Sequence, residues 1–94
     1  MKVAINSTYG GFSLSDFAKK ELGIEYDWDV SRTNPKLISF IEEHGYEACE
    51  GALCELKIVN VPDEATDWTI SEYDGLEHII YVLDGKLKSV WEDD

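Results

Sequence analysis

Two Asp-Gly pairs, Asp74-Gly75 and Asp84-Gly85, constrain the fold of this chain more than any other feature. Each pair separates two runs in which apolar and polar residues alternate. Asp-Gly readily adopts the positive φ angles of a two-residue hairpin turn, so such a pair between alternating runs is a strong signal for a β-hairpin. The pattern predicts a three-stranded antiparallel meander with strands over residues 68–73, 76–83 and 86–91.

The N-terminal part of the chain predicts a strand, a glycine turn and a short helix. Residues 2–6 form a short apolar run typical of a buried strand, and Gly10-Gly11 favours a turn soon after it. Ser13, with Asp16 three positions later, forms a capping-box pattern that places the start of the helix there. Gly23 follows the last apolar residue at helical spacing and is a suitable stop.

A second helix and two further strands are expected in the middle of the chain. Asn34 is a suitable N-cap, Pro35 suits the first helical position, and Gly45 marks the end. Residues 24–30 alternate apolar and acidic side chains, which indicates a half-buried strand or an extended loop, with Tyr26 and Trp28 on the apolar side. Residues 53–61 predict another strand, which we expect to join the sheet of the meander.

Together these elements predict an α+β fold in which two helices pack on one face of a mostly antiparallel sheet. The chain has 94 residues, which suits a single domain over residues 1–94 and leaves no room for a second. A chain this short buries only about 60–65% of its unfolded surface, so oligomerisation is one route to added stability.

The charge of the chain restricts its partners. Twenty Asp and Glu residues stand against eight Lys and Arg residues, which gives a net charge of −12. DNA, RNA and anionic membranes are bound through basic surfaces, so we expect none of them as a partner.

No run approaches the roughly 18 apolar residues of a membrane span, and no signal peptide is recognisable. A cytoplasmic protein is expected.

Neither a metal site nor a catalytic site is expected. A zinc site needs four well-spaced ligands, and Cys49 and Cys54 have only His44 and His78 as companions, so free thiols are expected. No pair of carboxylates and no serine–histidine pair has a spacing that marks a catalytic site. His78 is expected to be a partly buried histidine with a hydrogen-bonded ring nitrogen. We therefore expect a protein that is not an enzyme and needs no cofactor.

The glycine turn is the first candidate for binding an anion. A strand, two glycines and the start of a helix place backbone N–H groups at the positive end of the helix, and Ser13 adds a hydroxyl donor. Tyr9 or Phe12 would be able to stack on a base. The alternative is a purely structural tight turn in which Phe12 acts as a hydrophobic staple into the helix.

Two groups of cations are further candidates. Arg32, the only arginine, lies just before the second helix and would clamp a phosphate together with Lys36, or else form a salt bridge. Lys86 and Lys88 project from one face of the last strand, with Trp91 three residues further on. The alternative for this pair is a solvated edge strand that lysines protect from aggregation.

An ordered series of motifs spread over about half of the chain resembles a family of small phage and prophage proteins that includes the Thoeris anti-defence sponges. The motifs are Lys2-Val3-Ala4-Ile5-Asn6, Tyr9-Gly10-Gly11-Phe12-Ser13-Leu14-Ser15, Arg32-Thr33-Asn34-Pro35-Lys36-Leu37-Ile38, Leu56-Lys57-Ile58-Val59-Asn60-Val61-Pro62-Asp63 and Trp68-Thr69-Ile70-Ser71-Glu72-Tyr73-Asp74-Gly75-Leu76-Glu77-His78-Ile79. The sponges bind cyclic ADP-ribose signals made by bacterial TIR enzymes and hold them without degrading them.

The resemblance implies a counter-defence protein that sequesters a cyclic nucleotide as a homo-oligomer, in the cytoplasm of the host cell if the chain is phage-encoded. The implied ligand-binding residues are Asn6, Tyr9, Gly10, Gly11, Phe12, Ser13, Arg32, Lys36, Lys86, Lys88 and Trp91. The chain departs from the family after the Glu-Tyr-Asp-Gly motif. Family members carry a basic Lys-His-Arg-x-Trp stretch there, whereas this chain has Tyr81-Val82-Leu83-Asp84-Gly85-Lys86-Leu87-Lys88, so the resemblance leaves the identity of the ligand open.

The net charge supports an alternative function of a different class, an acidic inhibitor that binds a basic host protein directly as a nucleic-acid mimic. Association of such a protein would be steered by charge and would weaken with salt. The acidic clusters that would serve it are Glu25/Asp27/Asp29, Asp63/Glu64/Asp67 and Glu92-Asp93-Asp94.

Overall fold

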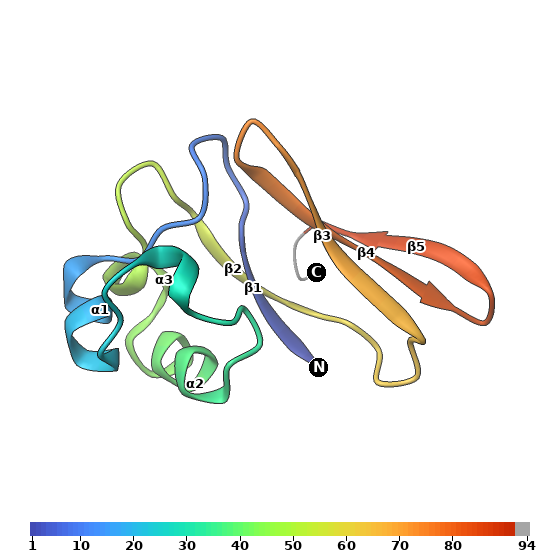
Figure 1. The fold of residues 1–94 in the computed structure, drawn as a ribbon, viewed down its shortest axis with the longest axis horizontal. Helices are drawn as coiled ribbons and strands as arrows, with labels where there is room; N and C mark the ends of the chain where they lie inside the picture. The colour runs from blue at the N-terminus through green and yellow to red at the C-terminus, as the bar shows by residue number, and fades with distance from the viewer. Residues whose placement is uncertain (92–94) are drawn as a thin grey trace.

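The computed structural model describes residues 1–91, which form an α+β fold with two antiparallel sheets (Figure 1). The predicted fold class is therefore confirmed, while the acidic cluster Glu92-Asp93-Asp94 lies outside the described residues. The elements in chain order are β1 (Lys2–Asn6), α1 (Asp16–Leu22), the 3-10 helix η1 (Asp27–Asp29), α2 (Pro35–His44), α3 (Tyr46–Cys49), β2 (Leu56–Asn60), β3 (Asp67–Tyr73), β4 (Leu76–Leu83) and β5 (Lys86–Val90).

The C-terminal meander is present as predicted, with strand order β3-β4-β5. Its two hairpins close with the pairs Tyr73↔Leu76 and Leu83↔Lys86. Asp74 and Asp84 have φ angles of 50° and 52°, and the glycine after each is also positive. These are the angles that a two-residue type I′ turn requires, so the local chemistry of Asp-Gly sets the register of the whole meander.

The strand predicted over residues 53–61 is shorter, and it does not join the meander. It is β2, and it pairs with β1 in a separate two-stranded sheet with Val3 opposite Val59. The reason is that both faces of this pair are apolar. Val3, Ile5 and Val59 pack against Ile79 of the meander, whereas residues on the opposite face pack against the helices. The β1–β2 sheet therefore forms the middle layer (Figure 1).

Both outer edges of the β1–β2 sheet are closed over much of their length by hydrogen bonds to other parts of the chain. On each strand two of the N–H groups that point away from the partner strand donate to acceptors outside the sheet. These bonds run from Ala4 N to Arg32 O, from Asn6 N to the Glu77 carboxylate, from Leu56 N to the Glu50 carboxylate and from Ile58 N to the Tyr46 hydroxyl.

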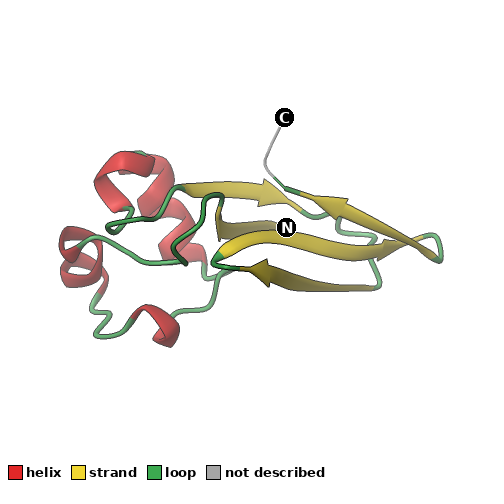
Figure 2. Cartoon of the chain, turned by 90° about the horizontal axis from the view of Figure 1, so that it is seen from above, coloured by secondary structure: helices red, strands yellow, loops and turns green. Residues whose placement is uncertain are grey.

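The helices gather at one end of the molecule and the meander extends to the other (Figure 2).

The prediction for α2 is confirmed, since Asn34 accepts a hydrogen bond from Lys36 N, Pro35 is the first residue and Gly45 is the C-cap. The short helix α3 was not predicted. The predicted cap of α1 was wrong by two residues: Ser15 accepts from Ala18 N, because Ser13 and Leu14 are held extended against Gly51 and Glu50.

The strand or extended loop predicted over residues 24–30 contains the short 3-10 helix η1 instead. Tyr26 and Trp28 are exposed, Trp28 by 78%, and their rings stack on each other 4.8 Å apart. No neighbouring strand lies beside this segment in the described part of the chain. Alternation alone does not make a strand when no partner takes its hydrogen bonds.

Candidate functional site

Arg32, predicted as a phosphate clamp or a salt bridge, forms a two-pronged ion pair with Glu77. Its Nη1 and Nη2 atoms lie 2.7 and 2.9 Å from the two carboxylate oxygens. Nη1 also donates to the carbonyl of Ala4, and the guanidinium carbon lies 3.5 Å from the ring centroid of Phe12. The Glu77 side chain is only 7% exposed. The charge of Arg32 is therefore matched inside the protein, at the junction of β1, β4 and the loop before α2.

Asn6 is fully buried and joins three segments of the chain. Its Nδ2 donates to Thr8 O and Gly75 O, and its Oδ1 accepts from Glu55 N. Its own backbone N–H donates to Glu77. With both ends of the amide bonded, Asn6 fixes the glycine turn against the first turn of the meander and against the start of β2.

The glycine turn packs against Gly75 with almost no space between the two backbones. A Cβ atom on Gly75 would lie 2.3 Å from Gly11 N, and Gly10 N donates to the carbonyl of Asp74. Tyr9 in this turn is exposed, and the Ser13 hydroxyl donates to Ala52 O. The N-terminal residues predicted to bind a ligand are thus brought together, in a joint where several of their polar groups already have partners.

Lys36 and the pair Lys86/Lys88 lie far apart in one chain. Lys36 is exposed in the first turn of α2, and Arg32 is anchored at Glu77 near the start of β4. Lys86 lies beyond the other end of β4, opposite Leu83, which is about 20 Å from Glu77 at 3.3 Å per residue. Figure 1 shows α2 and β5 toward opposite ends of the molecule, so the two cationic groups predicted from the sequence lie apart within a single chain.

Lys86 and Lys88 share their side of the meander with two aromatic residues. The register places Trp68 opposite Tyr81 and Tyr81 opposite Lys88, so the three form one row across β3, β4 and β5. Leu83 and Lys86 form part of the next row. Side chains directly opposite in a sheet have Cβ atoms about 5 Å apart. We call these five residues, Trp68, Tyr81, Leu83, Lys86 and Lys88, the lysine face.

The lysine face is the free end of the side of the meander that packs on the core. Trp68 and Tyr81 are partly buried against the cluster that contains Ile79, whereas both lysines are exposed. The aromatic rings therefore pack against the core, and the lysine side chains are open to solvent. Two cations beside two aromatic side chains suit a ligand that carries phosphate and a base. The carboxylate of Asp84, in the adjoining turn, is the nearest opposing charge along the chain.

Trp68 and Tyr81 were missed as candidates, although the sequence contained the signal for them. A two-residue turn at Asp84-Gly85 puts residue 81 opposite residue 88, and the turn at Asp74-Gly75 then puts residue 68 opposite residue 81. Trp91, which was a candidate, lies on the other side of the meander and stacks on His78 with ring centroids 3.8 Å apart. The expected hydrogen bond of the His78 ring is absent at Nδ1, which is buried without a partner among the described residues.

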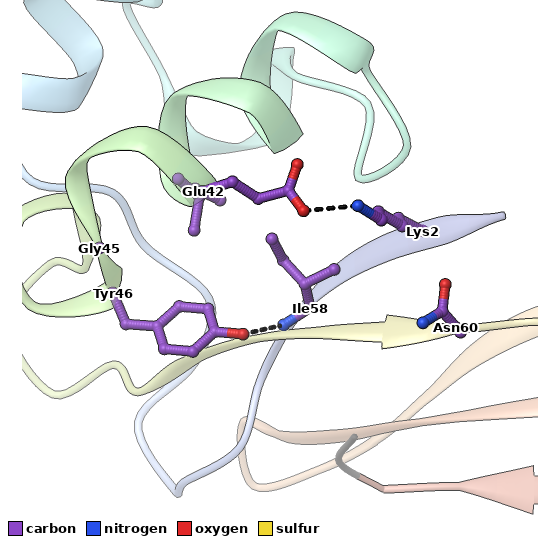
Figure 3. Close-up of a pocket in the computed structure, with 7 residues that line it drawn as sticks. Lys2, Glu42, Gly45, Tyr46, Ile58 and Asn60 are labelled. Carbon is purple, nitrogen blue, oxygen red and sulfur yellow. Dashed lines mark hydrogen bonds and ion pairs between the residues drawn. The ribbon is translucent and has the colours of Figure 1, made fainter. Parts of the chain in front are cut away.

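A cavity of about 550 Å³ lies between α2 and the β1–β2 sheet (Figure 3). Three of its polar side chains, those of Lys2, Glu42 and Tyr46, already have partners. Lys2 Nζ lies 2.5 Å from the Glu42 carboxylate, and the Tyr46 hydroxyl accepts from Ile58 N. With its one lysine matched by a glutamate, this cavity offers little to an anionic ligand.

Both cysteines are free and buried. Burial raises the pKa of the Cys49 thiol, and the charge of Glu50 raises it further. Burial also raises the pKa of Cys54, partly offset by hydrogen bonds with Ser13. A thiol with a raised pKa carries little thiolate and is a poor nucleophile.

Residues 1–91 contain no group of three His, Cys, Asp or Glu side chains placed to hold a metal ion. None of the helices formed by these residues has the length and apolar character needed to cross a membrane. No protein-family model matches the sequence, and neither the curated proteins nor the solved structures include one with significant similarity to it.

Proposed function

We propose that this chain is a phage counter-defence protein that binds a cyclic nucleotide signal of the cyclic ADP-ribose type and sequesters it without degrading it. The class of ligand and the phage setting come from the ordered sequence motifs. The observation that carries the proposal is the lysine face, where Lys88 lies opposite Tyr81 and on the same side of the meander as Lys86 and Trp68.

The chemistry of the lysine face fits this ligand class. Lys86 and Lys88 are two residues apart on one strand, so their Cα atoms are separated by about 7 Å. That spacing suits a ligand with two phosphate groups, each of which gains a charge-assisted hydrogen bond. Stacking of a base on an aromatic side chain contributes about 1–3 kcal/mol and tolerates different bases. The acidic net charge acts against long polyanions, whereas a small ligand responds mainly to the local cations.

A homo-oligomer is part of the proposal because the cations of one chain are divided between two places. Lys36 lies on α2 and Lys86 and Lys88 lie on β5. A second copy would bring its own α2 to the lysine face of the first, and a ligand would then lie between subunits. No catalytic step is proposed, since binding alone removes the signal from its effector.

Calorimetry tests the proposal directly. Wild-type protein at micromolar concentration is titrated with cyclic ADP-ribose isomers and with cyclic di- and trinucleotides. We expect heat from at least one of them. Lys88→Ala should weaken that binding by about 1.5 kcal/mol, or about tenfold, through loss of a charge-assisted hydrogen bond. Mass spectrometry after denaturation should return the ligand intact.

Lys20→Ala is the matched control, because Lys20 is an exposed lysine on α1 and its loss changes the net charge by the same amount. Binding by this variant should equal that of the wild type. An equal loss of affinity in both variants would show that only the overall charge matters and would remove the lysine face from the site. No heat with any of the nucleotides would sink the proposed function.

A further inference from the structure

The outer face of the meander, opposite the lysine face, carries exposed apolar side chains, and no element formed by residues 1–91 covers it. We define it by the residues whose side chains the register places on that side: Thr69, Ser71 and Tyr73 of β3, Leu76, His78, Ile80 and Val82 of β4, and Leu87, Ser89 and Trp91 at and after β5. Its strands carry one charged residue on this side, Asp67 at the beginning of β3. In a chain with 30% charged residues this is a marked depletion.

Large apolar side chains on this face are open to solvent. Leu87 is 75% exposed, Tyr73 is 70% exposed and Trp91 is 49% exposed. Ile80 and Val82 in the centre are partly exposed, since the described residues place no second layer over them. An antiparallel sheet that faces water usually carries polar residues on that side. Contiguous apolar surface with aromatic residues and few charges is typical of the centre of a protein–protein interface.

The charges around the outer face have one sign. Exposed aspartates lie at three points on its border. Asp67 is at the start of β3, Asp74 is in the first turn and Asp84 is in the second turn. The two lysines of the meander point to the other side. Two copies of this chain that met through this face would bring like-charged rims and two net charges of −12 together. A partner whose contact surface is surrounded by basic residues would instead be attracted by these aspartates.

The size of the face also argues against a stable dimer built on it alone. Eight residues of β4 span about 26 Å and three strands span about 14 Å, which gives a footprint of about 370 Å². A standard specific interface buries about 800 Å² on each partner. A small apolar centre assisted by charge suits a transient complex, in which opposite charge speeds association.

We propose that the outer face of the meander docks a partner protein that presents an apolar patch ringed by lysine or arginine. The apolar centre, Leu76, Ile80, Val82 and Leu87, supplies the contact, and the rim aspartates supply charge complementarity. This surface is distinct from the lysine face, so docking of a protein and binding of a nucleotide use opposite sides of one sheet.

The test uses a synthetic peptide of alternating leucine and lysine as the probe, with a leucine–glutamate peptide as its counterpart of opposite charge. Methyl NMR of the intact protein reports which side of the sheet is touched. The methyl signals of Leu76, Ile80, Val82 and Leu87 should shift on titration, and those of Ile79 and Val90 on the inner side should not. The glutamate peptide should produce no shifts, and added salt should weaken binding of the lysine peptide.

Two exposed leucines provide matched variants. Leu87→Ser removes an apolar side chain from the face and should weaken peptide binding at least about fivefold. Leu53→Ser removes an equally exposed leucine, 79% against 75%, from a loop elsewhere and should leave binding unchanged. Lys88→Ala should also leave peptide binding unchanged. Because this variant is expected to weaken nucleotide binding, it distinguishes the two kinds of binding.

Three results would overturn the proposal. Equal binding by the two leucine variants would mean that the peptide is held only by the net charge. Methyl shifts on the inner side would place the contact elsewhere. Self-association of the wild type at tens of micromolar, abolished by Leu87→Ser, would assign the face to a second copy of this chain.

Discussion

Arg32 and Glu77 are 45 residues apart in the sequence and joined by two hydrogen bonds of 2.7 and 2.9 Å. The pair links the loop before α2 to the first strand pair of the meander, and Asn6 N on β1 donates to the same carboxylate. Three layers of the molecule therefore meet at one carboxylate. The lysine face lies at the far end of β4, and its position relative to the core depends on this junction.

Replacement of Arg32 by alanine should destabilise the fold by about 3 kcal/mol, because it leaves the buried Glu77 carboxylate without its counter-charge. Urea denaturation at neutral pH measures this loss. The control is Lys2→Ala, which breaks the exposed ion pair with Glu42 and should cost about 0.5 kcal/mol or less. Similar losses in the two variants would show that the Arg32–Glu77 pair contributes no more than a surface contact.

Replacement of Gly75 by alanine should cost about 3 kcal/mol. About 1 kcal/mol comes from the positive φ of 89°, and about 2 kcal/mol from the collision of the new Cβ with Gly11 N. Gly85→Ala has the same turn position and a φ of 74° but nothing within 4 Å of the new Cβ, so about 1 kcal/mol is expected. Equal stabilities of the two variants would mean that the glycine turn moves away from Gly75 freely.

Stability should fall as the pH rises above about 9. The pKa values of Cys49 and Cys54 are raised in the folded protein from an ordinary value of 9.0, with burial as the largest cause. The unfolded chain then loses these protons at lower pH than the folded one, so alkali favours unfolding. The loss begins near the ordinary thiol pKa and levels off above the raised values.

Urea denaturation at neutral pH and at pH about 10 checks this linkage. In the double variant Cys49→Ala/Cys54→Ala, the alkaline loss of stability should be smaller than in the wild type. All other side chains are the same in both proteins, so their contribution cancels in the comparison. An identical pH dependence of the two would show that the thiols do not contribute.

Replacement of Tyr81 by leucine should weaken nucleotide binding by about 1.5 kcal/mol, or about tenfold, because leucine fills the partly buried site but offers no aromatic face for stacking. Tyr73→Leu changes a tyrosine on the outer face and serves as the control in the same calorimetric titration. If Tyr73→Leu lost as much affinity as Tyr81→Leu, the nucleotide would lie on the outer face, or its binding would depend on both faces.

The sequence predicted correctly those elements whose conformation depends on a few neighbouring residues, such as the hairpin turns and the ends of α2. Asp84-Gly85 fixed a hairpin and its register, and Asn34 and Gly45 marked the ends of α2. Both depend on backbone preferences within a few residues. The exposed pair Tyr26 and Trp28 shows the limit of such patterns, because alternation predicts a strand without providing its partner.

Long-range pairings were beyond the sequence patterns. Nothing near Arg32 in the chain identifies Glu77 as its partner, and nothing in β2 identifies β1 rather than the meander. For the candidate site, Lys86 and Lys88 were found from their spacing, whereas Trp68 needed the registers of both hairpins combined. The close packing of the glycine turn on Gly75 appears only in three dimensions, so no sequence pattern predicted it.

The closed edges of the β1–β2 sheet have a consequence for association between chains. A strand of another molecule can extend a sheet only where N–H and C=O groups are free, and the Ala4, Asn6, Leu56 and Ile58 N–H groups are all taken. Strand addition at these positions is therefore blocked, and on β5, an edge strand of the meander, the charges of Lys86 and Lys88 oppose it. Fibril-like growth is thus opposed by hydrogen bonds along much of the β1–β2 sheet and by charge on β5.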